Sequence, residues 1–166
     1  MKFEQRLDRA IERGRHAKDE RSREEAARQM SEEELRHLHS RARLELVDHI
    51  DNCLRAVADR FPGFTFSTVA GEDGWGAKIT RDDVILSRDE QRGTRGPAGT
   101  VYSRFELLVR PFSSARIVEL LVKGTIRNRE VLNRTHYQRL DQLDVASFTE
   151  QIDLWVLEYA ERFASG

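Results

Sequence analysis

Alternation of side-chain character between Val101 and Leu140 is the feature that most constrains how this chain can fold. Apolar and polar residues exchange places at successive positions there, as they do in a strand with one buried face. Pro111 and the small residues after it interrupt the first run, and Asn128 begins a second tight connection. The three predicted strands are Val101 to about Phe112, Arg116–Arg127 and Val131–Leu140. Their short connections predict an antiparallel meander, because parallel neighbours need crossovers of a dozen or more residues.

Further strands are predicted before this meander. Alternating residues flank the turn residues Gly71–Gly74, which is the pattern of a β-hairpin, and Arg81–Asp83 predict a second, polar turn. The predicted strands are Phe64–Ala70, Trp75–Thr80 and Val84–Leu86. Ser87–Thr100 contains three glycines and a proline and is predicted to be an exposed loop. We therefore expect about six strands in all.

A long helix is predicted before the strands, over about residues 32–60. Ser31 and Glu34 have the spacing of a capping box, and Pro62 with Gly63 predicts the end of the helix. Apolar residues recur every three or four positions between them, at Leu35, Leu38, Ala42, Leu46, Ile50, Cys53, Leu54, Val57 and Phe61. This continuous stripe indicates a helix with one buried side.

The last helix is predicted to begin near Ser147, which forms a second capping box with Glu150. Its apolar stripe is strongly aromatic and consists of Phe148, Ile152, Trp155, Tyr159 and Phe163. Such a stripe is expected to cover one face of the sheet. The predicted fold class is therefore α+β: a long N-terminal helix, an antiparallel meander and a C-terminal amphipathic helix, forming one domain over residues 31–166.

Residues 1–30 are rich in charged residues and thin in apolar ones, with Phe3, Leu7, Ile11 and Gly14 at roughly heptad spacing. Two alternatives stay open for this segment. It is either a helical arm that pairs with another chain or lies across the domain, or a frayed extension.

Composition and charge limit the classes of partner. The 166 residues carry a formal net charge of −1, which gives no reason to expect nucleic acid or a membrane surface as a partner. Residues 101–140 carry eight basic and three acidic groups, whereas residues 141–166 carry one and six. Either the acidic last helix packs beside the basic strands, or a basic sheet face binds an anion. Cys53 is the single cysteine, and there is no long apolar run, so we expect a cytoplasmic protein.

Motifs for catalysis or cofactor binding are absent from the sequence, so we assign no catalytic residue and expect no cofactor. His49 and Cys53 lie four residues apart, and Glu45 one turn earlier offers a third metal ligand. Cys53 also belongs to the apolar stripe, where a small buried thiol needs no further explanation, and no second pair of ligands is visible. We therefore expect no metal site.

Candidate ligand-binding residues come from the basic strands. Because Arg134 and His136 alternate with Tyr137, only one set can face solvent. If the side with Arg134 is open, these residues form a cationic sheet surface suited to a carboxylate or phosphate. The full candidate set is Arg134, His136, Tyr137, Arg104, Lys123 and Arg127.

Two functions follow from this sequence. The first is a non-catalytic binding or assembly module that engages a protein partner, or a second copy in a homodimer, through the long helix and the sheet. The alternative is a small-molecule or anion-binding domain with a pocket between the sheet and the C-terminal helix. The residues leave open whether such a domain would be an enzyme.

Overall fold

The computed structural model describes residues 2–85 and 99–166, together with their side chains except at 27–30 and 85. Most of the predicted loop Ser87–Thr100 lies outside the described residues. The chain divides into two compact units, Met1–Leu38 and His39–Gly166, and each is described by itself. No helix among the described residues has an apolar stretch long enough to cross a bilayer.

Unit 1 consists of helix: α1 spans Phe3–Arg60, so it begins in this unit and ends in unit 2. Every described side chain of unit 1 is exposed except that of Leu35, which is half-buried. Opposite charges one turn apart support the helix, as between Arg36 and Glu32, which lie 3.7 Å apart. The predicted helix start at Ser31 is wrong, because good helix formers surround it and nothing there stops the helix.

Unit 2 contains a single five-stranded antiparallel sheet in the order β1-β2-β3-β4-β5. The strands are β1 Thr65–Gly71, β2 Gly74–Ile85, β3 Gly99–Val109, β4 Ile117–Ile126 and β5 Arg129–Arg139. The meander is confirmed, but the count of six was one too many. The predicted turn at Arg81–Asp83 is wrong. These residues continue strand β2, and β2 pairs with β3 as far as Gly99. Arg81 and Asp83, two positions apart on one face of the strand, bond to each other at 2.8 Å.

The turn between β4 and β5 lies at Arg127 and Asn128, one residue earlier than predicted. Both have positive φ angles, 47° and 67°, as a type I′ hairpin turn requires. The Asn128 amide nitrogen donates to the Tyr102 carbonyl, and the Asn128 side-chain oxygen accepts from the Tyr102 amide. The turn is therefore fixed against β3 as well.

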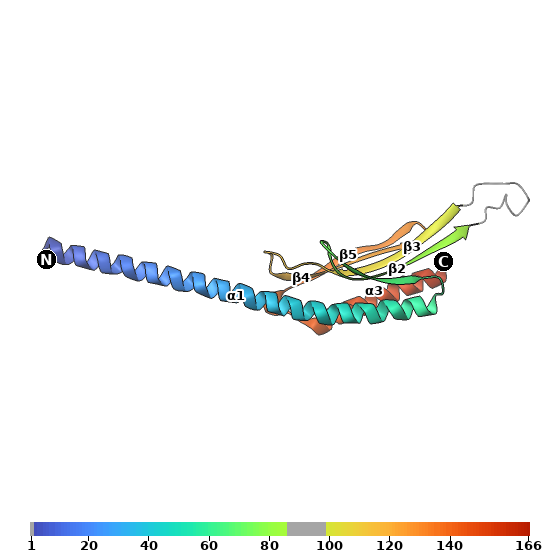
Figure 1. Ribbon diagram of the computed structural model, residues 1–166, viewed down its shortest axis with the longest axis horizontal. Helices are drawn as coiled ribbons and strands as arrows, with labels where there is room; N and C mark the ends of the chain where they lie inside the picture. The colour runs from blue at the N-terminus through green and yellow to red at the C-terminus, as the bar shows by residue number, and fades with distance from the viewer. Residues whose placement is uncertain (1, 86–98) are drawn as a thin grey trace, which may run out of the picture. The chain divides into compact units, whose positions relative to one another are not determined.

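The two faces of the sheet differ as the alternation predicted. In β4 buried residues alternate with more exposed ones, and Phe105, Leu107 and Leu120 on the same face of β3 and β4 are fully buried. Glu106 and Leu108 of β3 are buried on the other face as well. The C-terminal part of α1, from His39 on, and α3, which spans Val145–Ser165, both lie on this face of the sheet (Figure 1). A 3-10 turn at Leu140–Gln142 connects β5 to α3. No helix in the described part of unit 2 covers the opposite face, which we call the uncovered face.

The predicted aromatic stripe of α3 is confirmed, because all five of its residues are buried. Tyr159 stacks on Phe105 with ring centroids 4.4 Å apart, and its hydroxyl donates to the Thr125 carbonyl at 2.9 Å. Gly124 makes room for the ring, since a Cβ there would lie 3.0 Å from Tyr159. Asp144, rather than Ser147, caps the helix by accepting from the Ser147 amide.

The α1 helix packs beside α3 through the continuous part of its predicted stripe. Ala42, Leu46, Ile50, Leu54 and Val57 are buried there. His39 is a buried polar residue at the start of this segment: its Nε2 lies 3.1 Å from the Arg110 carbonyl oxygen, and its ring meets Phe112 edge-on. Burial lowers the pKa of His39 below its ordinary value, which favours the neutral ring at this position.

We expect Tyr159→Phe to lower the free energy of unfolding by about 1–2 kcal/mol, because the Thr125 carbonyl loses a buried donor. Tyr137→Phe removes the same hydroxyl from an exposed side chain and should stay within about 0.5 kcal/mol of the wild type. Urea denaturation of the three proteins measures both changes. Equal losses in the two variants would contradict this account of the core.

Candidate functional site

The structure separates the predicted ligand-binding residues between the two faces of the sheet. Arg134 and His136 lie on the face that carries the helices, at its β5 edge. Arg134 forms a bidentate pair with Glu158 of α3, at 3.0 and 3.4 Å, and His136 meets Phe148 edge-on. The Nε2 atom of His136 is buried without a hydrogen-bond partner among the described residues. The acidic last helix therefore neutralises part of the basic strands.

Tyr137, Arg104 and Lys123 lie on the uncovered face. Tyr137 is 63% exposed, whereas Arg104 bonds to Glu106 within the same strand. The register places Glu106 directly opposite both Lys78 and Lys123 on the neighbouring strands. Cross-strand pairs of opposite charge stabilise a sheet by roughly 0.2–1 kcal/mol. The uncovered face therefore has alternating charges rather than a uniformly cationic surface.

Arg127 lies apart from the other candidates, beside the end of α3. It lines a hollow of about 520 Å³ together with Arg129, Arg162 and Ser165. Arg162 is partly neutralised by Glu158, at 3.3 Å, and also donates to the Val131 carbonyl. The hollow thus gathers three guanidinium groups between the β4–β5 turn and the C-terminal helix. The candidate set as a whole does not converge on this place.

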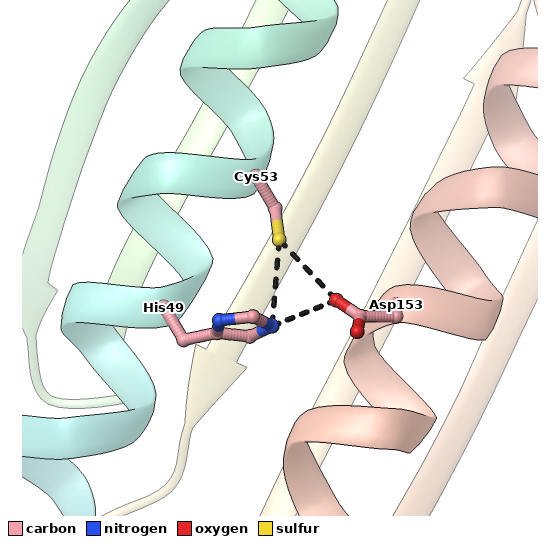
Figure 2. Close-up of side chains that lie close together, drawn as sticks. All are labelled: His49, Cys53 and Asp153. Atoms are coloured by element: carbon pink, nitrogen blue, oxygen red, sulfur yellow. Dashed lines mark hydrogen bonds and ion pairs between the residues drawn. The ribbon is translucent and has the colours of Figure 1, made fainter.

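A different group of side chains does converge, on the outer side of the two helices. His49, Cys53 and Asp153 point toward one another from α1 and α3 (Figure 2). His49 Nε2 lies 2.7 Å from Asp153 Oδ1, Cys53 Sγ lies 3.5 Å from His49 Nε2, and Cys53 Sγ lies 3.6 Å from Asp153 Oδ1. We call these three residues the helix-seam triplet. Glu45, which the sequence offered as a third ligand, is exposed and does not belong to it.

The helical stripes explain why these side chains meet. His49 and Cys53 each precede a buried residue of α1, and Asp153 follows a buried residue of α3. Each therefore lies at the margin of its helix's buried side, and the packing of the two helices brings the margins together. His49 and Cys53 were visible as a pair four residues apart in the sequence. Asp153 is a hundred residues away from Cys53, and no local pattern marks it.

The geometry of the triplet indicates which of its atoms carry a proton. An ionised Asp153 only accepts hydrogen bonds, so His49 donates from Nε2 and the Cys53 thiol donates to the same carboxylate oxygen. Burial, followed by the negative charge and hydrogen bond of Asp153, raises the pKa of Cys53 to about 11. The thiol therefore keeps its proton at neutral pH.

This arrangement is not that of a cysteine–histidine–aspartate catalytic triad. A triad needs one ring nitrogen on the nucleophile and the other on the carboxylate, whereas His49 presents Nε2 to both. A catalytic cysteine also needs a lowered pKa, and that of Cys53 is raised. The triplet has the donor atoms of a metal site instead, with its three ligand atoms within 4.8 Å of one another.

An apolar hollow of about 490 Å³ adjoins the triplet between α1 and α3. Cys53, Asp153 and Arg60 are its polar or charged lining residues, and the apolar ones are Ala56, Val57, Phe61, Val156, Leu157 and Ala160. Leu157 of α3 is 64% exposed. The triplet therefore borders a surface hollow rather than a closed core.

No protein-family model, curated protein or solved structure matches this chain.

We expect the Cys53 thiol to react slowly with iodoacetamide, because a pKa of about 11 leaves little thiolate at pH 8. Asp153→Asn should accelerate the reaction several-fold, because it removes a negative charge beside the thiol and weakens the acceptor of its hydrogen bond. The increase stays limited because burial, the larger cause of the raised Cys53 pKa, persists in this variant. Mass spectrometry of the alkylated chain over time measures the rates. Glu161→Gln, an exposed change on the same helix, is the control, and equal rates in all three proteins would contradict the interpretation.

Proposed function

We propose that this protein is a non-catalytic assembly module that pairs with a second copy of itself through the helix of unit 1. The observation that carries the proposal is a line of exposed apolar side chains on that helix. Phe3, Leu7 and Ile11 are 75%, 47% and 45% exposed, and they recur every four residues on one side of α1. Most of the stability of a helix in a protein comes from the packing of its apolar side. Phe3, Leu7 and Ile11 supply such a side on this otherwise polar helix.

Charge supports a second copy as the occupant, in antiparallel orientation. The first half of unit 1, residues 1–19, carries six basic and four acidic groups, whereas the second half, residues 20–38, carries four basic and six acidic groups. Two antiparallel copies place the basic half of each helix against the acidic half of the other. Complementary charge of this kind specifies partner and orientation more than it adds affinity.

The uncovered sheet face is the second surface of the proposed module. Its strands carry charged residues of both signs and the exposed ring of Tyr137, a residue type enriched in protein interfaces. A cytoplasmic location completes the proposal, since a free thiol such as Cys53 stays reduced there.

The dimer is tested by light scattering after size exclusion over a range of concentrations. We expect the wild type to have twice the monomer mass and Leu7→Glu to raise the dissociation constant at least about tenfold, because burying an apolar side chain is worth about 1.5–3 kcal/mol. Gln5→Glu is the matched control: it adds the same charge, but about 200° around the helix from Leu7. It should leave the mass unchanged.

A monomer at high concentration would overturn the proposal. Equal weakening by Leu7→Glu and Gln5→Glu would assign the pairing to net charge rather than to the apolar line, and would equally contradict it.

A second candidate function is anion binding in the arginine-lined hollow. We propose it because Arg127, Arg129 and Arg162 surround one concavity next to the C-terminal helix, and guanidinium groups suit phosphate or carboxylate oxygens. Arg129 has no ion pair among the described residues, so its charge is available to a ligand.

Inorganic phosphate tests this candidate. We expect phosphate to raise Tm above a chloride solution of equal ionic strength, and Arg129→Gln to remove at least half of the rise. Lys123→Gln removes one positive charge from the uncovered sheet face and should retain the full rise. If Lys123→Gln lost the rise in Tm and Arg129→Gln retained it, anion binding would belong to the uncovered sheet face instead. If phosphate did not raise the Tm of the wild type, both sites would be excluded.

A further inference from the structure

We propose that the helix-seam triplet, His49, Cys53 and Asp153, binds a divalent transition metal ion of the zinc class. A thiolate, an imidazole and a carboxylate are the three donor types that zinc takes in proteins. The sulfur donor argues against calcium and magnesium, which prefer oxygen ligands throughout. The two ligands on α1 are one turn apart and the third comes from α3, so the ion would join the two helices (Figure 2).

The spacing of the donor atoms fits a tetrahedral ion. With metal–ligand distances of about 2.3 Å to sulfur and about 2.0–2.2 Å to nitrogen or oxygen, tetrahedral ligands lie roughly 3.3–3.6 Å apart. The sulfur atom already has this spacing, at 3.5 Å from His49 Nε2 and 3.6 Å from Asp153 Oδ1. The nitrogen–oxygen distance of 2.7 Å is that of a hydrogen bond and must open by roughly 0.6 Å. The Asp153 side chain is 52% exposed, so a small rotation can supply this change.

Charge and protons balance on binding. The Cys53 thiol releases its proton to solvent as the sulfur–metal bond forms. The neutral His49 ring loses its hydrogen from Nε2 to solvent and takes one up on Nδ1, so that Nε2 can coordinate. No electron is transferred. The thiolate and carboxylate carry two negative charges, which cancel the two positive charges of the ion at a half-buried place. In the metal-free protein, the hydrogen bonds to Asp153 Oδ1 hold the same three atoms together.

Three protein ligands leave the fourth tetrahedral position to water or a solute, as in zinc sites that are not purely structural. The apolar hollow beside Cys53 and Asp153 gives such a solute a place to lie. The inference concerns unit 2 and is independent of the pairing proposed for unit 1.

Cobalt(II) is the probe for the test, because a thiolate bound to cobalt gives a sulfur-to-metal charge-transfer band and tetrahedral cobalt absorbs strongly in the visible range. The full chain, freed of metal with a chelator, is titrated with cobalt and then with zinc. We expect one cobalt per chain with the charge-transfer band, displacement of cobalt by zinc, and a rise in Tm on adding zinc.

Variants assign the ligands. Cys53→Ser should abolish the charge-transfer band, and Asp153→Asn should weaken binding by about 100-fold or more, since even changes outside the ligand set cost 10- to 100-fold. Asp59→Asn, an exposed change on α1, is the matched control for Asp153→Asn and should bind cobalt as the wild type does. His37→Gln, which removes an exposed histidine from the same helix, should also bind cobalt as the wild type does. A charge-transfer band that persists in Cys53→Ser, or equal binding by Asp153→Asn and Asp59→Asn, would overturn the proposal.

A measurement on the wild type keeps the test independent of whether the variants fold. Zinc at saturation should slow the alkylation of Cys53 at least tenfold at a pH where the free protein reacts measurably. Absence of cobalt absorption together with unchanged alkylation would show a hydrogen-bonded cluster without metal affinity, and the inference would be wrong.

Discussion

The packing of the α3 aromatic side chains on one face of the sheet is the contact on which the rest of unit 2 depends. A sheet with one apolar face needs a cover, and α3 supplies four aromatic rings on its buried side, those of Phe148, Trp155, Tyr159 and Phe163. The fit is specific rather than merely apolar, because Gly124 leaves space for the Tyr159 ring and Thr125 accepts its hydroxyl. At the far end of the helix, Phe163 meets Phe61 and Phe64 edge-on, so the residues that follow the end of α1 join the same cluster.

Much of this architecture could be predicted from the sequence, because it depends on side-chain periodicity. The strands from β3 to β5 and the stripe of α3 have periods that hardly admit another structure. The predictions failed where a short polar pattern was compatible with two different local structures. Arg81–Asp83 resemble a turn, but Arg81 packs over Phe64 and Phe163 while bonding to Asp83, and the strand continues. Ser31 and Glu34 have the spacing of a cap, but a cap has an effect only where a helix begins.

The candidate site was less accessible to prediction, since it depends on contacts between distant segments. Alternation divides β5 into two sets of side chains, but it does not say which set faces α3. The pairing of Arg134 with Glu158 depends on that choice. Likewise His49 and Cys53 are four residues apart, whereas the carboxylate that completes the triplet comes from the last helix. Local patterns predict elements well, and they predict poorly which margins of two helices will meet.

The meander order of the sheet has a consequence for the sequence of folding events. Every strand pairs with its neighbour along the chain, and the β4–β5 hairpin closes over two residues. The contacts between α1 and α3 instead join residues about a hundred positions apart, such as His49 and Asp153. Closing a loop of that length costs entropy before any contact offsets it, so short-range pairs form sooner. We therefore expect the two helices to pack on a sheet that has already formed, so that His49, Cys53 and Asp153 come together among the last contacts of the native state.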